Sequence, residues 1–432
     1  MQHDPLSGKA RRTGPPPISW LMKARLDNPD LISLAVGFVD QDTLPTQDAL
    51  ACCRAILEDA PRGKAALQYG STIGLPGLRE SILGRLAEEE GLSPGEHRLT
   101  PDHVVVTTGS QSLLYLATEV LVDPGDVVII GDPSYFVYMG ILEGVGADVR
   151  GVPVDGDGMR IDGLGALIDR LRGEGRLGRL KLIYVISYFQ NPSGVSLSGE
   201  RRRALVDLVG GIRDESPVFV LEDGAYRELR YGGPRLPPIK DLDRDNDLVA
   251  YTGTFCKSFS AGLKTGYGVL PDALLDPVLN EKGNLNFGSP NFNQCLLDEA
   301  IRSGRYARHV ETVRRGYEAK LRLALDALGE YMPDGVEWIE PRGGLYIWMT
   351  VPPSVDTGPE GELFKRSTDL GVLYVPGAFC FYPEPGREKP RNSLRLSFGV
   401  ESPDTVREGI RRLGRAVGDT LARAGSVGKS SC

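Results

Sequence analysis

Apolar runs that alternate with helical patterns constrain the fold of this chain more than any other feature. Between about residue 46 and about residue 300, short runs rich in valine, isoleucine and leucine recur between segments of helical periodicity. A strand that is apolar at successive positions has both faces buried, which is typical of a parallel sheet covered by helices. We therefore predict an α/β fold with a large domain built on a mostly parallel seven-stranded sheet between helices. The expected strands are Val104–Thr107, Val127–Ile130, Ala147–Val154, Leu182–Ser187, Val218–Glu222, Val249–Thr252 and Tyr267–Leu270.

The pattern changes after about residue 305, where a smaller α+β domain is expected. A long charged helix is predicted from about Tyr306 to about Leu328, and Leu394–Phe398 alternates with period two, as a half-buried strand does. The polar, proline-rich residues 1–19 are expected to be poorly ordered. The predicted parts are an N-terminal arm (1–30), a large domain (31–305) whose first part packs with the small domain, a small C-terminal domain (306–424) and a tail (425–432).

Composition excludes several classes of function. The chain has 432 residues, a formal charge of −8 and 25% charged residues, so it lacks the basic footprint of a nucleic-acid binder. No apolar run approaches the length of a membrane span, and no apolar signal core follows Met1, so a cytoplasmic protein without membrane partners is expected. The six cysteines and four histidines form no ligand pattern, and no metal site is predicted.

One lysine lies in a setting suited to catalysis. Lys257 stands between the expected apolar strand Val249–Thr252 and a loop rich in glycine and hydroxyl groups that includes Lys264. A partly desolvated lysine loses its proton more easily, and the neutral amine can form a Schiff base with an aldehyde. Most lysines are solvated surface residues, so this position alone decides nothing.

Three further motifs accompany Lys257 in a fixed order. Asn191 lies in an Asn-Pro-Ser-Gly turn, Asp223 ends a strand with Tyr226 three residues later, and Arg395 lies far downstream. This order resembles that of the aspartate aminotransferase superfamily, the class I/II fold-type I enzymes that use pyridoxal 5′-phosphate (PLP). The resemblance runs from about Ile32 to about Gly414, and it is closest to the branch that acts on aromatic amino acids, 2-aminoadipate or kynurenine.

The resemblance implies roles for these residues. Lys257 would bond to PLP and then carry protons, and Asp223 would pair with the protonated pyridine nitrogen. Asn191 and Tyr226 would donate hydrogen bonds to the phenolic oxygen of PLP. From the residues alone, Asp223 could instead cap a helix, and Asn191 could belong to an ordinary turn.

The phosphate of PLP is expected near the start of a helix. Ser110 and Gln111 follow a strand and Gly109, and a helix N-terminus offers unpaired N–H groups and partial positive charge. Thr254 and Lys264 would complete the phosphate site. Lys264 departs from the family, which usually has arginine there, so phosphate affinity is expected to be lower. Ser110 could also be a simple helix cap.

The substrate would meet a different set of residues. Arg395 is a charged residue in an apolar strand, so it needs either an internal ion pair or a bound carboxylate. In relatives the position of Gly37 lets the backbone approach the substrate, the aromatic position of Tyr135 stacks on the PLP ring, and the tyrosine matching Tyr69 reaches the partner's phosphate. An apolar pocket could include Tyr69, Tyr135, Phe38 and Tyr188, although these residues could equally belong to the core.

The resemblance therefore predicts a homodimeric aminotransferase that moves an amino group from an L-amino acid to a 2-oxo acid, with 2-oxoglutarate expected as acceptor. Its kinetics would be ping-pong. A PLP-dependent lyase, cyclising synthase or racemase would use the same residues. A PLP-sensing regulator would need a DNA-binding domain before the fold, and only about 30 residues precede the first motif here.

Overall fold

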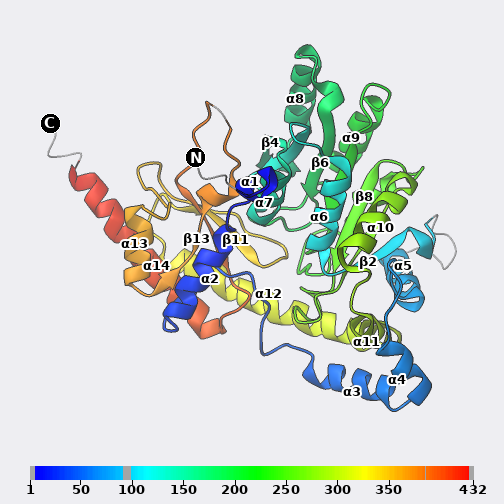
Figure 1. Ribbon diagram of the computed structural model, residues 1–432. Helices are drawn as coiled ribbons and strands as arrows, with labels where there is room; N and C mark the ends of the chain where they lie inside the picture. The colour runs from blue at the N-terminus through cyan, green and yellow to red at the C-terminus, as the bar shows by residue number, and fades with distance from the viewer. Residues whose placement is uncertain (1–4, 91–98, 385, 428–432) are drawn as a thin grey trace.

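The described part of the chain folds around an eight-stranded and a four-stranded β-sheet, and a long helix connects them. The computed structural model describes residues 5–90, 99–384 and 386–427 (Figure 1). The ends of the predicted arm and tail, residues 1–4 and 428–432, lie outside the described residues. No helix in these ranges combines the length and the apolar character that crossing a membrane requires.

The larger sheet has eight strands in the order β2-β9-β8-β7-β6-β3-β4-β5. The strands between β8 and β4 run parallel, whereas β9 is antiparallel to β2 and β8, and β5 is antiparallel to β4. All seven expected strands are present, and the eighth is a two-residue strand that is too short to leave a periodic pattern. The strands are β2 (Val104–Thr107), β3 (Val127–Asp132), β4 (Asp148–Asp155), β5 (Gly158–Met159), β6 (Leu180–Ile186), β7 (Phe219–Asp223), β8 (Val249–Thr254) and β9 (Gly266–Val269).

Helices bury both faces of this sheet, which explains the continuous apolar runs. Along β6, Leu182 and Tyr184 belong to one hydrophobic cluster, and Ile183 and Val185 belong to another on the opposite face. Burying an aliphatic side chain contributes about 1.5–3 kcal/mol, so a strand with two covered faces favours apolar residues throughout. The flanking helices are α3 (Thr46–Leu57), α4 (Ala60–Ala66), α5 (Pro76–Glu90), α6 (Ser110–Leu121), α7 (Phe136–Val145), α8 (Ile161–Gly173), α9 (Gly199–Gly211), α10 (Asp272–Asn286) and α11 (Asn291–Arg302).

The smaller sheet is antiparallel, with the order β10-β11-β14-β13. The helix α12 (Arg305–Tyr331) extends from α11 to α14 and links this sheet to the larger one (Figure 1). A separate parallel pair joins β1 to β12, so a strand near the N-terminus packs with the C-terminal part of the chain. The elements are β1 (Ile32–Ser33), β10 (Glu337–Trp338), β11 (Tyr346–Thr350), α13 (Glu362–Asp369), β12 (Val372–Leu373), β13 (Val375–Pro376), β14 (Ser393–Ser397) and α14 (Pro403–Val427).

The expectation of a poorly ordered N-terminal arm is wrong for the residues that the structure describes. Residues 8–12 form α1 (Gly8–Arg12), whose first turn is capped because the Ser7 hydroxyl accepts a hydrogen bond from the Ala10 N–H. Residues 17–27 form α2 (Pro17–Asp27), which has proline at its first position, where a missing N–H costs nothing. The Arg12 guanidinium donates to the carbonyl of Gly144 at the end of α7 and fastens this segment to the large sheet's helices.

Candidate active site

A pocket of 380 Å³ lies at the carboxyl ends of β6, β7 and β8, between the large and small sheets. Such strand ends are where ligands bind in open α/β sheets. The pocket brings together nearly all of the predicted site residues. Its lining includes Gly37, Ser110, Gln111, Tyr135, Asn191, Asp223, Tyr226, Thr254, Lys257, Lys264 and Arg395.

Lys257 follows β8 by three residues and reaches across the pocket to the N-terminal segment. Its Nζ atom donates to the carbonyl oxygen of Gly37 over 2.8 Å. Gly37 cannot be replaced without rearrangement, since a Cβ atom there would lie 2.1 Å from the hydroxyl of Tyr346. The hydrogen bond to Gly37 positions the lysine amine in the pocket that Asp223 and Arg395 also line.

Asp223 ends β7 and is buried. Its Oδ2 accepts a hydrogen bond of 2.9 Å from the Tyr184 hydroxyl, and its Oδ1 accepts one of 3.0 Å from the Ala225 N–H. Burial raises the pKa of Asp223 to about 6, against the two hydrogen bonds, which lower it. Among the described residues no cation forms an ion pair with this carboxylate, so it is a buried acid that lacks a positive partner. The preceding Glu222 points away and binds the N–H groups of Ile239 and Lys240.

Two tyrosines meet beside the lysine. The hydroxyls of Tyr226 and Tyr346 share a hydrogen bond of 3.1 Å, and their rings pack edge to face. Burial acts to raise the pKa of Tyr346, but the positive charges of Arg395 and Lys257 and the hydrogen bond with Tyr226 outweigh it. The pKa of Tyr346 therefore lies below the ordinary tyrosine value.

Tyr346 and Tyr184 were missed by the sequence interpretation. Tyr346 belongs to β11 in the small sheet, and Tyr184 lies in the middle of β6 as part of an apolar run. A tyrosine inside an otherwise aliphatic strand is a usable signal, because its buried hydroxyl needs a hydrogen-bond partner.

Arg395 lies in β14 and is 1% exposed. Its Nη1 donates to Asn191 Oδ1 over 2.8 Å and its Nη2 to the Ala35 carbonyl over 2.6 Å, while the Tyr346 ring lies under the guanidinium at 4.2 Å. The Nε atom has no hydrogen-bond partner, and no carboxylate in the described chain pairs with this arginine. The alternative of an internal ion pair is thus not realised, and a buried positive charge faces the pocket.

The opposite end of the pocket is a cup of small and hydroxyl-bearing residues. Gly109, which has a φ of +75°, precedes the first turn of α6, so the N–H groups of Ser110 and Gln111 begin the helix. Gly266 of β9 packs directly beneath, since a Cβ atom there would lie 2.6 Å from the Ser110 nitrogen. The Thr254 hydroxyl donates to the Thr265 carbonyl over 3.2 Å, and the exposed Lys264 closes the cup. Such a helix start, with a lysine beside it, suits an anion.

An apolar wall completes the pocket. Of the four aromatic residues proposed for it, Phe38 and Tyr135 line the pocket, whereas Tyr69 and Tyr188 do not. Ile18 also lines the pocket, although the sequence did not indicate it. It belongs to α2, and the folding of this helix brings Ile18 to the site. The apolar members of the wall are Ile18, Val36, Phe38, Leu114, Phe136, Val137 and Ile186.

Tyr69 lies outside the pocket of its own chain. It is 84% exposed and packs edge to face on Phe287, with ring centroids 5.8 Å apart. Leu67 and Leu285, two residues before each of these aromatic residues, are also exposed, so this part of the surface is unusually apolar.

The charges of the pocket define what it can bind. The pocket that holds the Lys257 amine has three further charged or polar features. They are the anion cup, the buried acid Asp223, which lacks a cation among the described residues, and the buried Arg395, which lacks an anion among them. PLP carries a phosphate, a protonatable ring nitrogen and an aldehyde, so the donor set fits this cofactor. No group of three or more histidine, cysteine, aspartate or glutamate side chains suited to a metal occurs in the described ranges.

Comparison with known proteins agrees with this arrangement. The family "Aminotransferase class I and II" matches residues 29–413. The chain is 29% identical to aromatic-amino-acid aminotransferase 1 of Thermococcus litoralis, over 92% of this chain and 90% of that protein.

Solved structures that share the fold include two aminotransferases. The multiple substrate aminotransferase of Thermococcus profundus has a TM-score of 0.86 and 32% identity, over 97% of this chain and 98% of that one. The alpha-aminoadipate aminotransferase of Thermus thermophilus, complexed with N-(5'-phosphopyridoxyl)-L-leucine, has a TM-score of 0.82 and 31% identity, over 96% of this chain and 98% of that one.

Proposed function

The chain belongs to the class I and II aminotransferase family, and from that premise we propose how its residues divide the work and which substrates it prefers. It transfers amino groups between small molecules with PLP as cofactor. When bound, PLP acts as an electron sink for negative charge that develops at the substrate Cα. Lys257, Asp223 and Arg395, which converge on one pocket, support the assignment of roles below.

We assign cofactor binding to two groups of residues, one for the pyridine ring and one for the phosphate. Asp223 would meet the protonated ring nitrogen, which supplies the cation that this buried carboxylate lacks. Asn191 and Tyr226 would face the phenolic oxygen, and Tyr135 would stack on the ring. The phosphate would occupy the cup formed by Ser110, Gln111, Thr254 and Lys264.

Arg395 would bind the α-carboxylate of the amino acid. Two of its donors are already oriented by Asn191 and Ala35, and the buried Nε has no partner, so the guanidinium is held before the substrate arrives. Lys257 would then move the Cα proton, since it lies in the same pocket and its amine is positioned by the Gly37 carbonyl.

The apolar wall favours a donor with a large apolar or aromatic side chain. The only cations that line the pocket within the described chain are Lys257, Lys264 and Arg395, and each already has a role in this assignment. A second carboxylate, as in 2-oxoglutarate, would therefore meet apolar side chains. We keep 2-oxoglutarate as an acceptor on the family resemblance and expect aromatic 2-oxo acids to have a lower KM.

The test is a half-reaction without acceptor. Holoenzyme mixed with L-phenylalanine should lose the visible absorption of the lysine-bound cofactor and release phenylpyruvate in stoichiometric amount, and L-glutamate should react more slowly. Lys257→Ala should still bind the cofactor but form no 2-oxo acid. Faster reaction of glutamate than of phenylalanine would refute the substrate preference, and 2-oxo acid formation by Lys257→Ala would refute the role of the lysine.

We further propose a homodimer in which Tyr69 completes the neighbouring site. Its exposure and its absence from the pocket of its own chain support this arrangement. Hybrid dimers of Lys257→Ala and Tyr69→Ala subunits test it, because one of the two sites then receives an intact lysine and an intact tyrosine. Activity in the hybrid above that of either parent is expected, and equal inactivity would contradict shared sites.

A further inference from the structure

A second cavity of 520 Å³ lies behind the active site, and nothing in the proposed reaction uses it. It opens between the loop after β6, the loop 229–236, the start of α12 and the segment before β11. Within the described part of the chain, its lining shares no residue with that of the catalytic pocket. The two are nevertheless neighbours, because Phe189 lines the second cavity and Asn191, two residues later, lines the first.

Arginine dominates the charge of this cavity. Among the residues that the structure describes, the acids in its lining are Asp157 and Glu340. Arg85 forms an ion pair with Glu228, and Arg227, Arg230 and Arg235 also have interactions of their own. The guanidinium groups in the lining nevertheless outnumber its carboxylates. The six arginines in the lining are Arg85, Arg227, Arg230, Arg235, Arg314 and Arg342.

At least two of these arginines have donors to spare. Arg314 uses its Nε on the Glu228 carbonyl over 2.6 Å, and no described residue accepts from its Nη atoms. The exposed guanidinium of Arg342 makes neither a hydrogen bond nor an ion pair with any residue that the structure describes. Guanidinium groups that converge on one cavity are suited to bidentate binding of phosphate oxygens.

The floor of the cavity is apolar and well supported. Tyr188 lies under two guanidinium groups, with Arg202 at 4.3 Å and Arg227 at 5.9 Å from its ring centroid, and its hydroxyl donates to the Leu236 carbonyl over 3.0 Å. Leu236, Val310 and Ile339 contribute further apolar surface. A ligand could therefore place charge on the arginines and an apolar ring on the floor.

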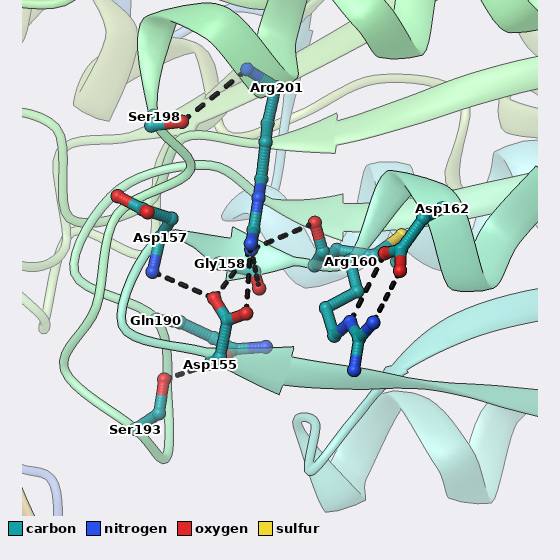
Figure 2. A network of polar contacts seen from close by, with 10 residues as sticks. Asp155, Asp157, Gly158, Arg160, Asp162, Gln190, Ser193, Ser198 and Arg201 are labelled. Carbon is teal, nitrogen blue, oxygen red and sulfur yellow. Dashed lines mark hydrogen bonds and ion pairs between the residues drawn. The ribbon is translucent and has the colours of Figure 1, made fainter.

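The hairpin between β4 and β5 forms part of the rim and is held in place by its own network. Figure 2 shows Arg201 reaching from α9 to Asp155, while the Asp157 N–H donates to Asp155 Oδ1 over 2.9 Å. Arg201 also donates to the Gly158 carbonyl over 2.8 Å. The rim is thus ordered without help from a ligand, as in preformed binding sites.

We propose that this arginine-lined cavity is a binding site for an organic phosphate of about nucleotide size, distinct from the phosphate cup of the cofactor. Its volume falls in the range of small-molecule sites, roughly 300–1,000 Å³. Several guanidinium groups around one space favour a ligand with two or more negative charges over a single carboxylate. A cavity of this volume with an apolar floor also suits a small molecule better than an extended polyanion.

Binding to the holoenzyme tests this site, since the bound cofactor then occupies the catalytic phosphate cup. Calorimetric titration with ADP at low salt should show one binding event per chain, which weakens as ionic strength rises. Pyrophosphate should bind more weakly than ADP because it lacks the ring, and adenosine should not bind detectably because it lacks the charge.

Substitutions that remove positive charge and one that removes negative charge test whether ADP binds in this cavity. Arg342→Gln and Arg314→Gln should each weaken ADP binding by about tenfold, as expected for one charged hydrogen-bonding group. Glu340→Gln should strengthen binding, because it removes an acid from the lining. Arg407→Gln, which changes a half-exposed arginine on α14 paired with Glu330, is the matched control and should change nothing.

Three results would overturn the proposal: no binding of ADP to the holoenzyme, equal binding of adenosine, or affinities that none of the cavity variants changes. Loss of binding in Lys264→Gln but not in Arg342→Gln would assign the ligand to the catalytic cup instead. None of these outcomes depends on the transamination assay, so the test is independent of the proposed function.

Discussion

The two ends of the catalytic pocket are built in different ways. One end is the cup that we propose for the phosphate, which comes from two short segments, 109–111 and 254–264, and its lysine is exposed. The opposite end joins Arg395 to Asn191, Ala35 and Tyr346, which lie far apart in the chain and come from both sheets or their connections. Charge interactions are stronger where water is excluded. Substitutions should therefore have larger effects at the arginine end than at the cup.

The largest of these effects is expected for Arg395. In Arg395→Gln the substrate carboxylate loses its charged partner in a buried site, and kcat/KM for an aromatic amino acid should fall roughly a hundredfold or more. Arg395→Lys keeps the charge but loses the fork that Asn191 and Ala35 orient, so an intermediate loss is expected. Steady-state kinetics and circular dichroism of both variants provide the check. A loss of less than tenfold in Arg395→Gln would place the carboxylate elsewhere.

Replacing Asp223 by asparagine should raise the stability of the cofactor-free protein at neutral pH and lower the activity of the holoenzyme. The pKa of Asp223 is about 6 in the folded protein, above the ordinary value of 3.8. Between these two pH values the native protein therefore binds more protons than the unfolded chain. The free energy of unfolding falls as pH rises through this window. Above it, the charged carboxylate costs about 1–3 kcal/mol in the protein without cofactor. Asp223→Asn should remove that cost.

Thermal unfolding of the cofactor-free protein measures this difference. The Asn variant should be more stable than the wild type at pH 8, and the gap should shrink toward pH 5. Its transamination rate should nevertheless be much lower. Equal unfolding temperatures at pH 8 would mean that the carboxylate is not penalised by burial.

A smaller effect on activity is expected for a substitution at Gly37, whose carbonyl accepts the hydrogen bond from Lys257. Gly37→Ala would place a Cβ atom 2.1 Å from the Tyr346 hydroxyl and displace the carbonyl that holds Lys257, so kcat should fall by about tenfold. In the double variant Gly37→Ala with Tyr346→Phe, the clashing oxygen is absent. The double variant should be more active than Gly37→Ala alone, and simple additivity of the two losses would contradict the steric account.

The same contrast decides what the sequence could predict. The predicted strands of the large sheet have bounds correct to about two residues. A strand buried on both faces needs apolar side chains at successive positions, and such a run is easy to recognise in the sequence. The residues of the cup and Lys257 could also be named as candidates, since they lie close in the chain, and the structure brings them to one pocket. Their roles stay predictions. Tyr346 was missed because its place depends on the register that pairs Trp348 with Arg395 and makes Tyr346 a diagonal neighbour.

The N-terminal segment was predicted wrongly for a related reason. Only Leu21 in α2 is fully buried, so the helix leaves a weak amphipathic pattern. Its order comes from packing against parts of the chain that are distant in sequence. Proline at the first position of α2 was a usable signal for a helix start, and that start brings Ile18 to the pocket.

The smallest effect is expected at the exposed cup. Lys264→Arg would restore the guanidinium that the family usually has and could bind two phosphate oxygens, but the surrounding water weakens each contact. Cofactor affinity should therefore rise only a few-fold, and Lys264→Gln should lower it by about tenfold. Both can be measured by titrating the cofactor-free protein with PLP. If Lys264→Arg instead weakened binding, the φ of +46° at this residue would be holding the lysine where a longer guanidinium does not fit. The cup would then be shaped for lysine and would not be a weakened arginine site.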